Sequence, residues 1–359
     1  MMPKVAELRT VIQDGQVKRA TAILRACPTA AADWRPIMDA CLHGEPEILK
    51  ALLDYGADPN AVSQSASRYR PLHRAIEVKK SIKRKPGHVA VLTILLDAGA
   101  QVDAIGCWYD GRPLQTAAIA GDDSAARILL DRGARRDISC AVLTGDMKLL
   151  NSALKQDRGR AAAAVESGAE PLHLLCSSLL ARPCAAAMAE RLISAGARPE
   201  RAAPMRHAAL TPMHFACFSE QCSHALIEVL IAHGAAPQDG MYETLFKGDF
   251  ATTALLVKHG AKVNARWHNG RPLLCEMLQA GRNKAVTWLL AHDADPNESD
   301  PRGWGALHYA ASRGTPDALV RQLLRRGADS RHRNKQGLRP VDLVARTARR
   351  QFAAVTGAV

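Results

Sequence analysis

Histidine and cysteine side chains gather in one stretch of the sequence, which contains His214-x-x-Cys217 and Cys222-x-His224. Four nitrogen and sulfur ligands can close a tetrahedral zinc site. However, His214 is one of four histidines at equivalent points of a repeated pattern, and Cys217 occupies a position that small apolar residues fill elsewhere. A cysteine in such a position behaves as a small apolar residue. We therefore assign no metal ligands and expect no cofactor.

The repeated histidines are the other candidates for chemistry. They are His73, His173, His214 and His308, and each follows Leu or Met. A general base needs a partner that orients it and a substrate within hydrogen-bonding reach, and no such partner recurs beside them. No phosphate-binding loop, nucleophile elbow or metalloprotease helix is present. We assign no catalytic residues and expect a protein that is not an enzyme.

The elements that position these histidines form a repeated unit, seen most clearly at residues 300–329. A glycine-containing turn leads to a short helix predicted for 307–312, a turn at Gly314, a second helix predicted for 316–325, and an exit at Gly327-Ala328. The same pattern recurs about nine or ten times along the chain at a period near 33 residues, which is typical of a repeat array.

Each recurring residue has a physical role in this unit. Proline at the first helical position has a preset φ and loses no needed hydrogen bond. Glycine between the helices and at the exit permits the left-handed conformation that ends a helix. Alanine pairs let first helices of neighbouring units approach closely, and leucine pairs in the second helix fill the space between layers.

The pattern Gly-x-Thr-Pro-Leu-His, Ala-Ala, Gly, Leu-Leu, Gly-Ala-x-x-Asn resembles the ankyrin repeat, and the resemblance covers nearly the whole chain. It implies an all-α dominated repeat solenoid: stacked helix-turn-helix ankyrin repeats with short β-hairpins, here called fingers, that project between repeats. It also implies that partners bind the finger tips and first helices, and that the repeated histidines and Asn60, Asn264 and Asn297 are structural. We expect a divergent, bacterial-type member of this family.

Departures from the pattern are informative. The units that begin at Ile138 and Met241 follow the preceding exit so closely that we expect no finger there. Insertions are predicted at 79–87 and at 177–183, and residues 202–210 lengthen one finger. The predicted domains are an N-terminal capping helix pair (1–35), the repeat array (36–339, about nine units), and a C-terminal capping helix and tail (340–359), with the last helix over 340–352.

The amino-acid composition indicates which partners and which cellular compartment to expect. The net charge of +13 favours acidic partners. The nine cysteines are scattered and odd in number, which favours reduced thiols and a cytoplasmic location. The N-terminus has no apolar signal core, and no apolar run approaches the length of a membrane span. We expect a monomer that does not contact membranes.

Arginine and aromatic residues in the predicted fingers are the candidate partner-binding residues. Arginine replaces the usual threonine before several prolines, although it loses a helix cap worth about 1 kcal/mol and faces the positive end of the helix dipole. Exposed Trp, Tyr and Arg are frequent hot-spot residues. The alternative is that the arginines are simply solvated and that each ring packs on its own finger. The predicted residues are Tyr69, Arg70, Trp108, Tyr109, Arg112, Trp267, Arg271 and Trp304.

These features predict a non-catalytic protein–protein interaction scaffold, adaptor or inhibitor. One alternative is a nucleic-acid-associated regulator that uses the basic insertion 79–87 and the basic C-terminus, although no nucleic-acid-binding motif accompanies them. Another is a bacterial effector that acts on host proteins.

Overall fold

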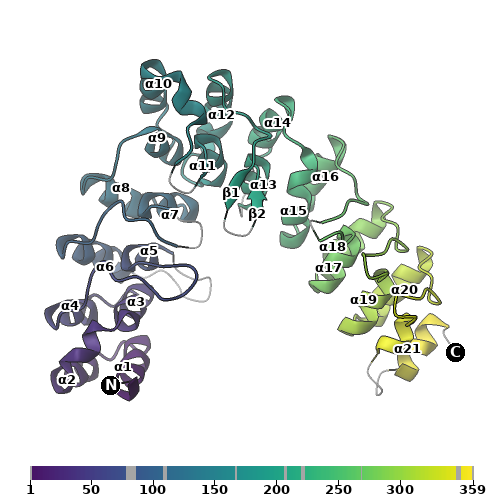
Figure 1. Cartoon of the computed structure of the whole chain (residues 1–359), viewed down its shortest axis with the longest axis horizontal. Helices are drawn as coiled ribbons and strands as arrows, with labels where there is room; N and C mark the ends of the chain where they lie inside the picture. The colour runs from purple at the N-terminus through teal and green to yellow at the C-terminus, as the bar shows by residue number, and fades with distance from the viewer. Residues whose placement is uncertain are drawn as a thin grey trace. The chain divides into compact units, whose positions relative to one another are not determined.

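A computed structural model describes residues 2–77, 86–107, 111–165, 168–205, 208–219, 223–267, 269–344 and 349–357. The chain divides into two compact units. Unit 1 contains Met1–Phe215 and Ala225–His233, and unit 2 contains Ala216–His224 and Gly234–Val359. Within each unit, short helices follow one another in pairs joined by tight turns (Figure 1).

Unit 1 holds most of the helix pairs and the one named β-hairpin of the described chain. Its elements are α1 (Met2–Gln13), α2 (Val17–Ala26), η1 (Pro28–Ala32), α3 (Trp34–His43), α4 (Pro46–Asp54), α5 (Pro71–Ile76), α6 (Pro86–Asp97), α7 (Pro113–Ala120), α8 (Asp123–Asp131), α9 (Ile138–Thr144), α10 (Met147–Gln156), η2 (Arg158–Ala162), α11 (Pro171–Ser177), η3 (Arg182–Cys184), α12 (Ala185–Ser194), β1 (Ala203–Met205) and β2 (Ala208–Leu210). α13 (Pro212–Phe218) and α14 (His224–Ala232) contribute residues to both units.

Unit 2 continues the same alternation of first and second helices. Its elements are η4 (Pro237–Gly240), α15 (Met241–Lys247), α16 (Phe250–Lys258), α17 (Leu273–Gln279), α18 (Asn283–Ala291), α19 (Ala306–Arg313), α20 (Asp317–Arg325), η5 (Pro340–Leu343) and α21 (Arg349–Thr356).

First helices stack on first helices in each unit, because their facing residues are small. α5 packs on α7 and α7 on α9 in unit 1, and α17 packs on α19 in unit 2. Ala117 and Ala310, which lie in the middle of such helices, are completely buried. Of each predicted leucine pair in the second helices, the first residue is buried and the second is half-buried, except that Leu289 and Leu290 are both buried.

The turn between paired helices combines a glycine with an aspartate. Gly145 ends α9 with φ 77°, a left-handed conformation that favours glycine. The side chain of Asp146 then accepts the backbone N–H of Leu149 at 2.9 Å and caps α10. The same pair recurs at Gly121-Asp122 and Gly248-Asp249.

Three of the repeated histidines, His73, His173 and His308, tie their first helix to the finger that follows the same repeat. His173 Nδ1 accepts the backbone N–H of Glu170 at 3.2 Å, so its Nε2 carries the proton and donates it to a carbonyl. The Nε2-to-carbonyl distances are 2.9 Å for His73 to Gly111, 2.9 Å for His173 to Arg201 and 3.1 Å for His308 to Leu338. Burial lowers the pKa of His73 and of His173 to about 4. These rings are therefore neutral structural groups, as the family resemblance implies.

The asparagines after the exits make a second tie, to the exit of the next repeat. Asn60 donates to Gly99 O at 3.0 Å and accepts the N–H of Gln101 at 2.8 Å. Asn297 makes the same pair of bonds with Gly327 and Asp329, at 2.8 Å each. The structural role predicted for these asparagines is confirmed.

Fingers are present and absent where the sequence predicts them. β1 pairs with β2 in the lengthened finger, and single bridges close the fingers at Gly106–Gly111 and Arg266–Pro272. Residues 132–137 and 233–240 are all described, and no β-bridge occurs in either segment. The repeats that begin with α9 and α15 thus lack fingers, as predicted.

Three predictions of local structure, for the last helix and for the two insertions, have different outcomes. The single last helix predicted over 340–352 is wrong, because the chain forms the 3-10 turn η5 and then α21, which begins at Arg349. The insertion at 177–183 is confirmed as the irregular segment and η3 between α11 and α12. Of the predicted insertion 79–87, residues 79–85 lie outside the described residues.

Candidate protein-binding surface

The arginines that precede the prolines bond mainly within the chain. Arg70, the residue before α5, donates from Nε to Ile105 O at 2.9 Å and from Nη1 to Asn60 O at 3.1 Å. It therefore joins its own finger to the next one. The guanidinium satisfies two part-buried carbonyls, and this structural role offsets the missing helix cap.

Arg112 and the remaining arginines of this series pair with carboxylates. Arg112 Nη1 lies 3.1 Å from Asp137 Oδ2, and only 14% of its side chain is exposed. The corresponding distances to carboxylate oxygens are 2.6 Å for Arg35 to Asp33 and 3.5 Å for Arg339 to Asp342. A paired arginine presents less free charge to a partner than a solvated one does.

Tyr69 is half-buried at the end of the first finger of the array. Its hydroxyl donates to Glu77 Oε1 at 2.9 Å, and the Arg74 guanidinium lies 4.5 Å from the ring centroid. Burial, followed by the neighbouring Glu77 carboxylate, raises the pKa of Tyr69. Trp108 and Tyr109, which are also predicted partner-binding residues, lie outside the described residues.

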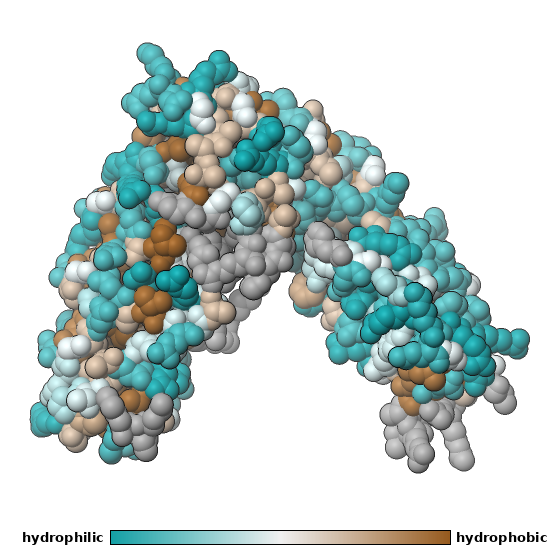
Figure 2. All heavy atoms as spheres, viewed as in Figure 1, coloured by the Kyte–Doolittle hydropathy of each residue, from teal (hydrophilic) through white to brown (hydrophobic). Residues whose placement is uncertain are grey.

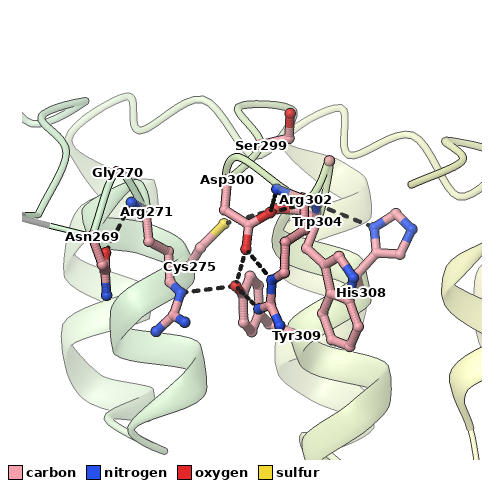
Figure 3. A network of polar contacts seen from close by, with 12 residues as sticks. Asn269, Gly270, Arg271, Cys275, Ser299, Asp300, Arg302, Trp304, His308 and Tyr309 are labelled. Carbon is pink, nitrogen blue, oxygen red and sulfur yellow. Dashed lines mark hydrogen bonds and ion pairs between the residues drawn. The ribbon is translucent and has the colours of Figure 1, made fainter. Parts of the chain in front are cut away.

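Arg271 belongs to a polar network in unit 2 that is centred on the buried hydroxyl of Tyr309 (Figure 3). This hydroxyl donates to Asp300 Oδ2 at 2.6 Å. It accepts from Arg271 Nε at 2.8 Å and from Arg302 Nη2 at 2.9 Å. Arg271 also contacts Glu276 at 2.5 Å. Two arginines thus face two carboxylates, and the network is balanced in charge.

The network fixes the ionisation of its central groups. Burial alone would raise the pKa of Asp300, but hydrogen bonds from Tyr309, from the Trp304 backbone and from Arg302 hold that pKa below its usual value. Burial, together with the bond to Asp300, raises the pKa of Tyr309 to about 12. The carboxylate is therefore charged and the phenol is neutral at physiological pH.

Trp304 lies at the outer edge of this network and is half-buried. Its backbone N–H donates to Asp300 Oδ1 at 2.9 Å. The Arg302 guanidinium lies 4.9 Å from the Trp304 ring, within cation–π range. The ring is thus held in one orientation by the finger.

Trp267 belongs to a continuous stack of aromatic rings in unit 2. Its ring lies 4.0 Å from the Tyr242 ring, and Tyr242 lies 5.6 Å from Phe246, with interplanar angles of 20° and 23°. The Arg282 guanidinium lies 3.9 Å from the Phe246 ring centroid and continues the stack. We name Arg282, Phe246, Tyr242 and Trp267 the aromatic ladder.

The sequence reasoning singled out Trp267 but missed the other members of the aromatic ladder. Tyr242 and Phe246 are four residues apart on α15, so they share one helix face. This spacing, in a first helix with no finger of its own, is a signal that could have identified them. All three rings are half-buried, which leaves part of each available to a partner.

Other candidate sites do not assemble in the described part of the chain. There, no group of three or more His, Cys, Asp or Glu side chains is placed to hold a metal ion. Cys222, from the motif weighed above, lies outside the described residues. The cysteines at 27, 41, 107, 140, 176, 184, 217 and 275 are not in disulfide bonds. Within the described ranges, no helix is both long and apolar enough to cross a membrane.

The viewed surface is mixed in character (Figure 2), and two arginines of the basic C-terminal segment have partners within the chain. The viewed face is largely hydrophilic, with hydrophobic residues in separate patches (Figure 2). In the C-terminal segment, Arg333 Nη1 donates to Gly337 O at 2.6 Å, and Arg339 pairs with Asp342. Arg333 therefore bonds within its own finger, and Arg339 pairs with a residue of η5.

Comparison with known proteins identifies relatives over parts of the chain. The family described as "Ankyrin repeats (3 copies)" matches residues 37–140 and 274–355, together more than half of the chain. The B-cell lymphoma 3 protein homolog of Mus musculus is 33% identical over 189 residues, which cover 50% of this chain and 40% of that protein. Protein phosphatase 1 regulatory subunit 27 of Homo sapiens is 37% identical over 76 residues, which cover 21% of this chain and 49% of that protein. The chain thus spans less than half the length of each of these relatives.

One solved structure resembles a large part of the chain. The crystal structure of the ankyrin repeat domain of Bcl-3, described as a unique member of the IkappaB protein family, aligns with a TM-score of 0.51 and 26% identity. The alignment covers 62% of this chain and 99% of that chain. This likeness agrees with the stacked helix pairs described above.

Proposed function

The chain belongs to the ankyrin repeat family, and from this premise we propose that it is a non-catalytic protein-binding scaffold, adaptor or inhibitor. Its partner would lie against the fingers and first helices. One relative bears the name of a regulatory subunit of protein phosphatase 1, which supports a regulatory role for this kind of chain. Because fold alone does not determine function, the proposal depends on a surface that could bind.

The observation that carries this proposal is the aromatic ladder with the neighbouring Arg302–Trp304 pair. Rings and arginines of this kind contribute large contact area at a small entropic cost, and they dominate the energetics of protein interfaces. Trp267 and Trp304 occupy successive fingers of unit 2 and are only half-buried. We propose these two, with Tyr69, Arg70, Trp108, Tyr109, Arg112 and Arg271, as partner-binding residues.

The proposed partner is a protein with an acidic surface, and the proposed setting is a monomer in the cytoplasm. The net charge of +13 supports the choice of partner, since opposite charge speeds encounter and selects among partners. The free thiols agree with a reducing compartment. A regulator of the cell's own proteins and an effector that acts on host proteins would both use this surface.

Affinity capture from a lysate of the source organism tests the proposal. The baits are the wild-type chain, the double variant Trp267→Ala/Trp304→Ala, and Trp288→Ala as a matched control. Trp288 lies on the second helix α18, where it stacks on His292 at 3.7 Å. Circular dichroism first establishes that all three baits are folded.

We expect one protein to bind the wild type and the control equally and to bind the double variant at least about tenfold more weakly, as loss of hot-spot residues would produce. Equal binding to all three baits would contradict the proposed surface. Recovery of nucleic acid alone, removed by salt, would instead favour the regulator that uses the basic segments.

A further inference from the structure

The two repeats without fingers differ in the size of two side chains on their first helices, α9 and α15. α9 and α15 can be aligned residue by residue, because each has seven residues, ends at a left-handed glycine and precedes a capping aspartate. In this alignment Ser139 corresponds to Tyr242, and Leu143 corresponds to Phe246. The two positions that carry aromatic rings in unit 2 therefore carry smaller side chains in unit 1.

The fingers that follow these two repeats differ in the same way, with a smaller side chain in unit 1 and an aromatic ring in unit 2. Val165 donates its backbone N–H to Ala169 O, and Trp267 donates its own to Arg271 O, each at 2.8 Å. The valine and the tryptophan therefore occupy equivalent positions. Trp267 stacks on Tyr242 and fills the place of the missing finger in unit 2. In unit 1 the smaller residues Ser139, Leu143 and Val165 line an open depression.

The lining of this depression indicates the chemistry of what it would bind. Its apolar part is aliphatic and consists of Ile105, Leu114, Leu143, Val165 and Leu174, with the Cys140 thiol. Because the described lining is aliphatic, the depression favours an aliphatic side chain through burial of apolar area.

The charged residues at the rim compensate one another. Arg112 pairs with Asp137 at 3.1 Å, and Asp137 Oδ1 also accepts the N–H of Cys140 at the start of α9. Asp103 accepts the backbone N–H of Arg135 at 3.1 Å and lies 3.9 Å from the Arg135 guanidinium. Binding here should therefore depend little on ionic strength, unlike binding driven by the overall positive charge.

We propose that this depression binds a short extended segment of a protein partner that takes the place of the missing finger and inserts one Leu, Ile or Met side chain over Leu143 and Leu174. The chain's own Trp267 shows that an apolar side chain presented by an extended segment can close such a gap. This inference rests on the proposed function, and it names a second contact site, in unit 1.

The test uses random linear peptides displayed on phage and selected on the full chain. Val165→Trp reproduces the residue that fills the gap in unit 2 and should block the depression. Ala202→Trp is the matched control, since it adds the same ring at an exposed position of another finger in unit 1.

We expect the selected peptides to share one Leu, Ile or Met at a fixed position. Their affinity should fall at least about tenfold for Val165→Trp, the effect of losing one buried aliphatic side chain, and stay within about twofold for Ala202→Trp. It should also change less than about twofold between about 50 and 300 mM NaCl. Methyl NMR of the wild-type chain, which does not depend on how the variants fold, should place the peptide against Leu143 and Leu174.

The absence of any enriched peptide, equal affinity for Val165→Trp, or peptide contacts away from the methyl groups of these two leucines would overturn the inference. A captured protein that binds Val165→Trp normally but is lost by Trp267→Ala/Trp304→Ala would overturn it while leaving the proposed function intact. Loss of the proposed function would instead show as a failure to capture any protein.

Discussion

Replacement of Tyr309 by phenylalanine should destabilise unit 2 by about 2–3 kcal/mol. The hydroxyl is completely buried and donates a 2.6 Å hydrogen bond to the buried carboxylate of Asp300. Hydrogen bonds to charged groups contribute about 1.5–3 kcal/mol each. Arg271 and Arg302 also lose an acceptor, but each keeps a carboxylate partner, so we expect little further cost from them.

Phenylalanine keeps the ring and its packing, so the effect isolates the hydroxyl. Urea unfolding followed by circular dichroism measures the change in the free energy of unfolding. For a unit of this size, a loss of about 2–3 kcal/mol corresponds to a fall in Tm of about 5–10 °C. Tyr242→Phe is the matched control, because it makes the same change in a half-buried ring of the same unit, outside the Tyr309 network. If the two variants were equally stable, the reasoning about the network would be refuted.

Three further predictions concern pH and helix capping. Burial raises the pKa of Glu243 to about 8, above its value in the unfolded chain. The charged carboxylate therefore destabilises the fold at high pH, and Glu243→Gln should stabilise the chain by about 1–3 kcal/mol at pH 9. Urea unfolding at successively lower pH should show that this gain vanishes near pH 4.5. Burial depresses the pKa of His73 and of His173 to about 4 in the folded chain, so the unfolded chain binds more protons below pH 6.5. The urea concentration at the unfolding midpoint should therefore fall between pH 6.5 and 4, with up to two protons taken up on unfolding. A midpoint that does not change with pH would exclude the burial of these histidines as neutral rings. Asp146→Ala removes the cap of α10 and should lower stability by about 1 kcal/mol in thermal melts, whereas Asp146→Asn should change it by much less.

The sequence was sufficient to predict the repeats, because each helix boundary has its own local signal. Prolines, left-handed glycines and repeated histidines act within a few residues, so their positions alone predict where helices begin and end. The two missing fingers followed from the same spacing, since the segments before Ile138 and Met241 are too short for a hairpin. The last helix was misplaced because η5 and α21 lack the glycine that marks the turn in other repeats.

The candidate site was less predictable, because it depends on which side chains meet between repeats. Arg271 was recognised from its place before a proline, but its contact with Tyr309 joins residues in two repeats and has no local signature. The stack of Trp267 on Tyr242 likewise depends on the absence of a finger over α15. Partner binding stays a prediction for all eight candidate residues, of which Trp108 and Tyr109 lie outside the described residues.

The histidine and asparagine ties have a mechanical consequence. The tie of His73 reaches Gly111 and that of Asn297 reaches Asp329, so each joins a repeat only to the next one. Because each tie spans only two neighbouring repeats, a pulling force acts on the contacts of one repeat at a time. Pulled from one end, it should lose its repeats one after another, and each released repeat of roughly 33 residues would lengthen the chain by about 110 Å. Stretching would therefore detach part of a bound partner's contact surface while neighbouring repeats stay folded.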